Sequence, residues 1–145
     1  MMKIKLMALC LMCLMCLLTG CAEKKTEAEK PVPTVRIAQG AYQYDHGYQL
    51  AEGWMYDMTI SADKQMAELD ALVSAAVFEP TGEDFLVEVG YRLAWYDAEG
   101  NMTRELLVLS AAEASMDGMM YRMSNADGLA GWLDALKLAE QDVTE

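Results

Sequence analysis

The stretch that most limits the fold of this chain runs from Phe85 to Tyr96, where apolar and polar side chains alternate. A repeat of two residues is the repeat of a β-strand, because successive side chains point to opposite faces. The stretch therefore predicts a strand with six apolar or aromatic side chains on one face. These six are Phe85, Val87, Val89, Tyr91, Leu93 and Trp95.

Further strands are indicated on both sides of this one. Residues 35–44 are rich in β-forming side chains, and residues 54–60 alternate so that one face of a strand is buried. Asp97 to Asn101 is typical of a hairpin turn, after which residues 102–110 return as a strand. The Asp117-Gly118 pair is the strongest short hairpin signal and predicts a last strand at residues 119–123.

Apolar side chains at helical spacing mark two other segments, residues 62–77 and a segment from Leu129 to about Ala139. The first segment is followed by Pro80, which ends a helix. Strands, a helix, hairpins and a second helix, in this order, are typical of an α+β domain. We expect a mostly antiparallel sheet with two helices packed on one face.

The chain begins with a segment of another kind. Lys3 and Lys5 form a basic head, and residues 6–18 contain only Leu, Met, Ala and Cys. This pattern is typical of a secretory signal, and the run is shorter than the roughly 20 residues that a membrane span needs. The run ends in Leu18-Thr19-Gly20-Cys21, which resembles the lipobox of bacterial lipoproteins at every position.

The resemblance implies a defined maturation. The Cys21 thiol receives a diacylglycerol, and signal peptidase II recognises the three preceding residues and cuts between Gly20 and Cys21. Two acyl chains suffice for stable anchoring to a membrane. The other cysteines, Cys10, Cys13 and Cys16, are removed with the signal, so the mature domain keeps no thiol for catalysis, disulfides or metal. The covalent diacylglycerol on Cys21 is the only cofactor expected.

Composition divides the chain into four parts. Residues 1–20 are the expected signal peptide, and residues 21–34 the lipidated N-terminus and a flexible tether. The tether has mixed charge and contains Pro31 and Pro33, which is linker composition. Residues 35–140 are the expected single domain, and residues 141–145 a frayed tail.

The formal net charge of −12 limits the partners of the protein. It lacks the basic footprint of a nucleic-acid-binding protein, so no nucleic acid partner is expected. An anionic membrane surface repels an acidic domain, so the lipid on Cys21 must provide the membrane contact. We expect an extracytoplasmic location on the cell membrane.

Aromatic residues near the start of the domain are the candidate ligand surface. Packing in the core is the more frequent role of such a group, because aromatic side chains are common in β-sheets. Within the group, Tyr42, Tyr44 and Tyr48 are expected to be the most exposed, and they could stack on a glycan or a peptide.

Metal and catalytic sites were weighed against simpler roles. Met116, Met119, Met120 and Met123 could bind copper(I), although strand geometry separates them and core packing explains them better. The only histidine, His46, lies in a predicted turn exposed to solvent. No catalytic motif is present, so no catalytic or metal-binding residue is assigned, although a pair of carboxylates could still serve a hydrolase.

The order of elements and the Tyr-Asp-Ala-Glu-Gly-Asn hairpin at residues 96–101 resemble small uncharacterised lipoproteins of Gram-positive bacteria. This resemblance implies no activity and no site residues. The sequence thus predicts a lipid-anchored, non-enzymatic binding domain with an unknown protein or glycan partner. An exported copper-binding protein and a small envelope hydrolase are the alternatives.

Overall fold

A computed structural model describes residues 30–141, apart from the side chains of residues 53–55 and 138–141. Contacts divide the chain into two units, Met1–Lys30 and Pro31–Glu145. The expected signal peptide, Cys21, most of the tether and residues 142–145 lie outside the described residues. None of the helices in the described range has the length and apolar content that a membrane span requires.

The domain contains seven strands and two described helices. The strands are β1 (Thr34–Tyr44), β2 (Tyr48–Ile60), β3 (Val77–Asp84), β4 (Glu88–Tyr96), β5 (Met102–Val108), β6 (Glu113–Met116) and β7 (Met119–Ser124), and the helices are α2 (Asp63–Ala75) and α3 (Asp127–Gln141).

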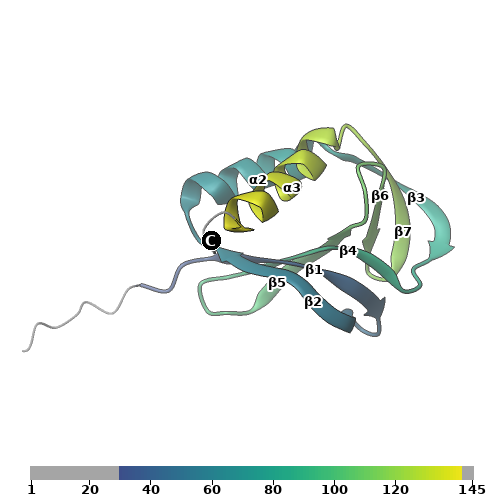
Figure 1. Cartoon of the computed structure of the whole chain (residues 1–145), viewed down its shortest axis with the longest axis horizontal. Coiled ribbons are helices and arrows are strands. Elements are labelled where there is room, and N and C mark those ends of the chain that lie inside the picture. The colour runs from purple at the N-terminus through teal and green to yellow at the C-terminus, as the bar shows by residue number, and fades with distance from the viewer. Residues whose placement is uncertain (1–29, 142–145) are drawn as a thin grey trace, which may run out of the picture. The chain divides into compact units, whose positions relative to one another are not determined.

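The strands form one sheet in the order β2-β1-β4-β5-β6-β7-β3, and every neighbouring pair is antiparallel. Helix α2 connects the edge strand β2 to the opposite edge strand β3. Both helices lie on the same face of the sheet (Figure 1). The expected α+β class, with an antiparallel sheet and two helices on one face, is confirmed.

The main core fills the space between the helices and the sheet. Leu69 and Val73 of α2 and Leu129 and Leu133 of α3 pack with alternate side chains of the central strands. The indole N–H of Trp95 donates to the Asp70 carboxylate at 3.0 Å, which attaches α2 to β4. Since the predicted helical stripes supply these contacts, the amphipathic pattern positions both helices.

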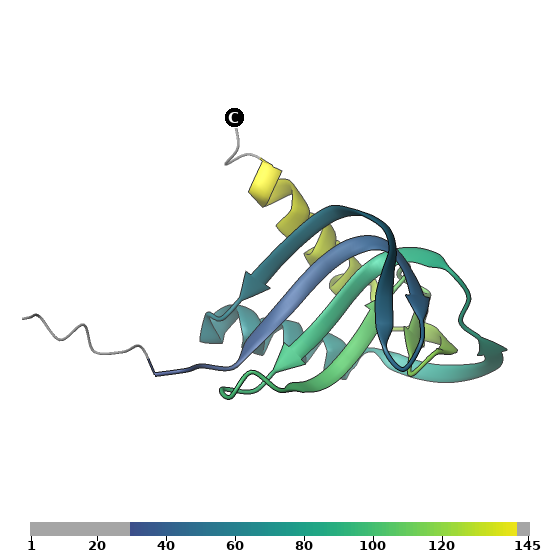
Figure 2. The ribbon, with the colours of Figure 1, turned by 90° about the horizontal axis from the view of Figure 1, so that it is seen from below.

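A second core lies on the opposite face of the sheet. Its buried side chains are Tyr42, Tyr48, Phe85 and Leu107. No helix in the described range covers it. Instead, the sheet curls, as Figure 2 shows, and the start of β2 reaches β6, four strands away in the sheet. The contact is a hydrogen bond of 2.5 Å from the Tyr48 hydroxyl to the Ser115 hydroxyl.

Glycines allow close approaches at two places in the sheet. Gly40 and Gly90 are paired across β1 and β4, beside an irregularity in the β1–β2 ladder. A Cβ atom on Gly90 would lie 2.7 Å from the Val108 carbonyl oxygen. A Cβ atom on Gly118 would lie 2.4 Å from the Tyr44 ring, so the β6–β7 turn passes directly over that ring.

The alternation from Phe85 to Trp95 predicted one continuous apolar face. The structure does not bury these side chains together. Tyr91, Leu93 and Trp95 are buried in the main core, and Phe85 is buried in the second core. Val87 and Val89 are 56% and 52% exposed. Residues 85–87 precede β4, which begins at Glu88, so the predicted strand starts three residues too early and Val87 lies in the connection between β3 and β4.

Other strand boundaries also differ from the prediction. Residues 78–84, where no strand is predicted, belong to β3, and β2 begins at Tyr48, earlier than its alternating part. Both are edge strands with long exposed stretches, so neither shows the apolar periodicity of a strand packed on a core. The two hairpin turns at residues 97–101 and 117–118 are confirmed.

Candidate functional site

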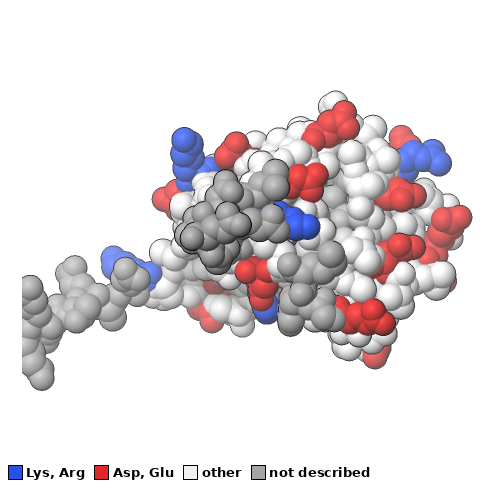
Figure 3. Space-filling model, viewed as in Figure 1, with Lys and Arg blue, Asp and Glu red and all other residues white. Residues whose placement is uncertain are grey.

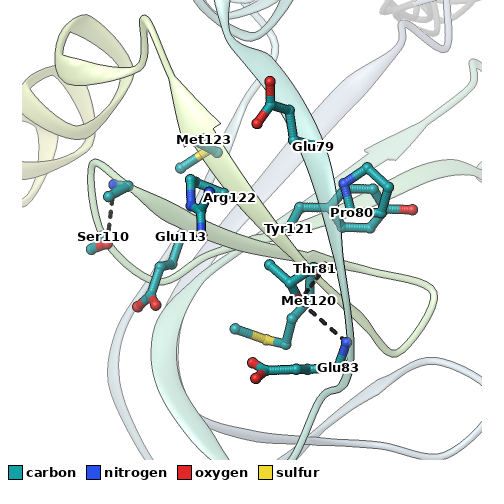
Figure 4. Close-up of a pocket in the computed structure, with 11 residues that line it drawn as sticks. Glu79, Pro80, Thr81, Glu83, Ser110, Glu113, Met120, Tyr121, Arg122 and Met123 are labelled. Carbon is teal, nitrogen blue, oxygen red and sulfur yellow. Dashed lines mark hydrogen bonds between the residues drawn. The ribbon is translucent and has the colours of Figure 1, made fainter.

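A hollow of about 620 Å³ opens beside strands β3, β6 and β7 (Figure 4). It also touches Ser110 and Ala112 of the β5–β6 connection. Glu113, Arg122 and Glu79 stand at paired positions on β6, β7 and β3, so they share one face of the sheet. Because their chain neighbours pack towards the helices, this is the face away from the helices.

An irregularity in β3 shapes the hollow. Pro80 pairs with Tyr121 and Asp84 with Met119, so β3 has extra residues between these two pairs. The extra residues arch away from β7, and Gly82 adopts a positive φ of 81°. The Thr81 hydroxyl donates to the Met120 carbonyl at 3.2 Å and accepts the Glu83 N–H at 3.2 Å, which fixes the arch.

The charges of the hollow are mixed. Figure 4 shows the carboxylates of Glu79, Glu83 and Glu113 on separate sides, with Arg122 rising from β7 between β3 and β6. Among the described residues, the Arg122 guanidinium has no hydrogen bond and no ion pair, and its side chain is exposed. The hollow can therefore offer donors to an anionic group and acceptors to a cationic group at the same time.

No group of three or more His, Cys, Asp or Glu residues in the described part of the chain could hold a metal ion. Three of the four methionines proposed for copper are divided between the two cores, and the fourth, Met119, is 37% exposed. Met123 is buried in the main core, Met116 packs against that core, and Met120 packs against the second core. The thioethers of these three methionines therefore pack in two separate apolar environments.

The tyrosines proposed as a ligand surface are mostly buried, so this expectation was wrong. Tyr42 and Tyr48 are 1% and 5% exposed, and Tyr44 is half-buried against Gly118. Burial raises the pKa of both Tyr42 and Tyr48 to about 12. The curl of the sheet, which the sequence does not reveal, turns these side chains into the second core.

A buried polar chain links these tyrosines to the β6–β7 hairpin. The Gly118 N–H donates to the Tyr48 hydroxyl, which donates to Ser115 Oγ. Ser115 Oγ in turn donates to the Met119 carbonyl at 2.9 Å. Both hydroxyls in this series of hydrogen bonds have partners, so the fully buried Ser115 has a structural role.

Two other predicted features have simple roles. His46 has a positive φ of 52° in the β1–β2 turn and a side chain that is 99% exposed, as expected. The Asp97 carboxylate accepts N–H groups of Asn101 and Glu99, and the first of these does most to hold its pKa below the usual range. The loop therefore uses this carboxylate to close its own turn.

A smaller hollow of about 250 Å³ lies between α3 and the ends of β4 and β5. There the Tyr91 hydroxyl donates to the Asp134 carboxylate at 2.9 Å. Burial, followed by this hydrogen bond, raises the pKa of Tyr91. The contact joins α3 to the sheet, and we assign it to stability.

In comparisons with protein families, with curated proteins and with solved structures, no match to this chain was found. The candidate site is therefore assigned from its own geometry. Sequence reasoning missed it because β3 was not expected to be a strand. The sequence signal was present, since Pro80, Thr81 and Gly82 lie between two glutamates, a pattern that can mark an interrupted edge strand.

Proposed function

We propose that the protein is an extracytoplasmic lipoprotein whose α+β domain is a binding module held at the membrane surface by a lipid on Cys21. The observation that carries this proposal is the Leu18-Thr19-Gly20-Cys21 sequence at the end of a short apolar run. The charged, proline-containing segment between Cys21 and Thr34, where β1 begins, supports it. As a coil, such a segment spans roughly 20 Å, enough to hold the domain clear of the lipid headgroups.

The hollow beside β3 is the proposed binding site for a protein or glycan partner. Its volume falls within the range of about 300–1,000 Å³ typical of ligand sites. Arg122 provides donors to an acidic group, and the surrounding glutamates accept hydrogen bonds from hydroxyl or ammonium groups. A binding role is supported because these groups are accessible and unpaired with one another.

The anchor is tested with two matched cysteine variants. Cys21→Ala removes the proposed acceptor, and Cys16→Ala removes a cysteine of the segment that is discarded. Cells that express each protein are fed labelled palmitate, and the mature N-terminus is identified by mass spectrometry. We expect wild type and Cys16→Ala to carry lipid on an N-terminal Cys21, and Cys21→Ala to remain unlabelled. A labelled Cys21→Ala protein, or a wild-type product that keeps residues 1–20, would contradict the proposal.

The binding site is tested by photo-crosslinking in the native envelope. A photoreactive residue replaces Glu83 at the hollow or, as a control, the exposed Glu68 on α2. We expect a discrete cross-linked product only from position 83, and Arg122→Ala should weaken it. Identical products from both positions, or none from position 83, would refute the assignment of the hollow.

A further inference from the structure

Four exposed apolar side chains lie at the end of the sheet where β3 connects to β4. Leu86, Val87, Val89 and Met119 are 75%, 56%, 52% and 37% exposed. The first three follow one another along residues 86–89, and these four side chains are called the apolar strip below. Exposed apolar residues that occur singly are ordinary, but a group of them marks an interaction surface.

Backbone contacts bring the four side chains to the same end of the domain. Asp84 pairs with Met119 across the β3–β7 ladder. The N–H of Phe85 donates to the Gly118 carbonyl at 2.8 Å, so the chain enters residues 86–89 directly beside the β6–β7 turn. The buried Phe85 side chain holds this segment against the second core, so the strip rests on a fixed base.

Acidic side chains surround the apolar strip. Asp84, Glu88 and Asp117 are all exposed, and residues 84–91 and 111–121 contain no Lys or Arg. Figure 3 shows that Asp and Glu also predominate over Lys and Arg at this end of the molecule, around β3. The chemistry of the surface is therefore apolar at its centre and anionic at its border.

This border discriminates between possible occupants. A second copy of the chain would bring its own acidic residues against these, at a net charge of −12 for each copy. An anionic lipid surface would repel them in the same way. A partner with apolar side chains flanked by Lys or Arg would bury the strip and neutralise its border, so charge complementarity selects this class.

We propose that the apolar strip binds a cationic amphipathic peptide segment, with its apolar face on Leu86, Val87, Val89 and Met119 and its basic residues against the acidic border. This surface is separate from Arg122 and the hollow, and its role does not depend on lipidation of Cys21. Aliphatic side chains already exposed in the free domain can dock with little rearrangement of the backbone.

The proposal is tested with the full chain in a neutral detergent, with empty micelles as the blank. The probe is a fluorescent amphipathic helix of lysine and leucine, and its anisotropy reports binding. We expect the double variant Leu86→Ser, Val87→Ser to lower the affinity about tenfold or more, because it removes the central apolar contacts. Glu88→Gln should lower it two- to threefold, and added salt should weaken wild-type binding.

Val77→Ser is the matched control. Val77 is also an exposed valine, 48% accessible, but it lies at the opposite end of β3. It should leave both affinity and melting temperature unchanged. An affinity equal to that of wild type in the double variant would overturn the proposal, as would binding no stronger than to empty micelles.

The other occupants give distinct results in the same samples. Sedimentation that shows a dimer of wild type and a monomer of the double variant would assign the strip to a second copy. Flotation of Cys21→Ala with phosphatidylglycerol vesicles, lost in the triple variant that adds Leu86→Ser and Val87→Ser, would assign it to the membrane. Either result would replace the peptide as occupant.

Discussion

The two cores of this domain lie on opposite faces of one sheet and are built in different ways. The main core is largely aliphatic and is covered by α2 and α3. The second core is smaller, rich in aromatic side chains, and covered by the curled sheet itself. Leu106 and Leu107, adjacent in β5 and each 0% exposed, point into the main and the second core respectively.

The difference shows what each face requires of its sequence. The main core depends on apolar volume, which many side chains can supply. The second core depends on particular atoms, namely a hydroxyl that reaches Ser115 and a glycine that allows Tyr44 to approach. Substitutions that preserve hydrophobicity should therefore be tolerated in the first core and damaging in the second.

The largest expected effect separates the two cores directly. Leu106→Ala should lower the free energy of unfolding by about 4 kcal/mol, because the helices prevent the main core from collapsing into the cavity. Leu107→Ala should lower it by about 2.5 kcal/mol, since its half-buried neighbours Leu109 and Met120 can move into the space. Urea denaturation of both variants measures the difference. Equal losses would show that the second core is packed as rigidly as the first.

Gly118→Ala should follow, at about 3 kcal/mol. Gly118 has a φ of 76°, and a Cβ atom there would collide with the Tyr44 ring at 2.4 Å. Gly100→Ala isolates the backbone contribution, because Gly100 has a φ of 86° with open space around it, and should lose only about 1 kcal/mol. Thermal unfolding compares the two. If their losses match, the contact with Tyr44 has no part in holding the β6–β7 turn.

Tyr48→Phe should lower the free energy of unfolding by about 1.5 kcal/mol. The change keeps the ring and removes the hydroxyl, which leaves buried Ser115 without its donor. Tyr44→Phe is the control, because the described residues give the Tyr44 hydroxyl no hydrogen bond, and it should be neutral within error. Chemical denaturation of both variants tests this, and equal stability of the two would remove the buried polar chain from the account.

The smallest effect lies on the exposed part of the face away from the helices. Arg36 Nη2 donates to Asp57 Oδ2 at 2.6 Å. Hydrogen bonding from the Arg36 side chain holds the pKa of Asp57 below its usual range. The stabilisation is therefore present above the ordinary aspartate pKa and is lost as the pH falls through the lowered folded-state value. Because both side chains are more than a third exposed, Asp57→Asn should cost less than about 1 kcal/mol at neutral pH.

Stability curves of wild type and Asp57→Asn against pH check this prediction. The two curves should converge in acid, where Asp57 of wild type is protonated. A gap that persists below the folded-state pKa would mean that the substitution acts through packing.

The sequence predicted the elements that pack against the main core. Met66, Leu69 and Val73 of α2 follow the helical repeat, and Tyr91, Leu93 and Trp95 follow the strand repeat, because each faces a continuous apolar layer. The Asp117-Gly118 turn was equally predictable, since both residues adopt the positive φ that this hairpin turn needs. These signals are local, and the structure preserves them.

The candidate site and the second core could not be predicted in the same way. Both depend on which strands become neighbours, and β3 lies beside β7 only because α2 crosses the sheet. The exposure of Val87, in the β3–β4 connection, and of Val89, near the start of β4, depends on tertiary contacts, which no local pattern encodes. Sequence periodicity reports that a face is apolar, whereas tertiary structure decides whether anything covers it.

The hydrogen bond between Tyr48 and Ser115 also has a consequence for folding order. It joins residues separated by 67 positions in the chain. Strand β1 also lacks its second neighbour in the sheet until β4 has been synthesised. During synthesis from the N-terminus, the β1–β2 hairpin therefore has an unpaired edge on β1 until more of the domain has followed. Such long-range pairing slows folding, so this protein should gain its final structure late and depend on being kept from premature association.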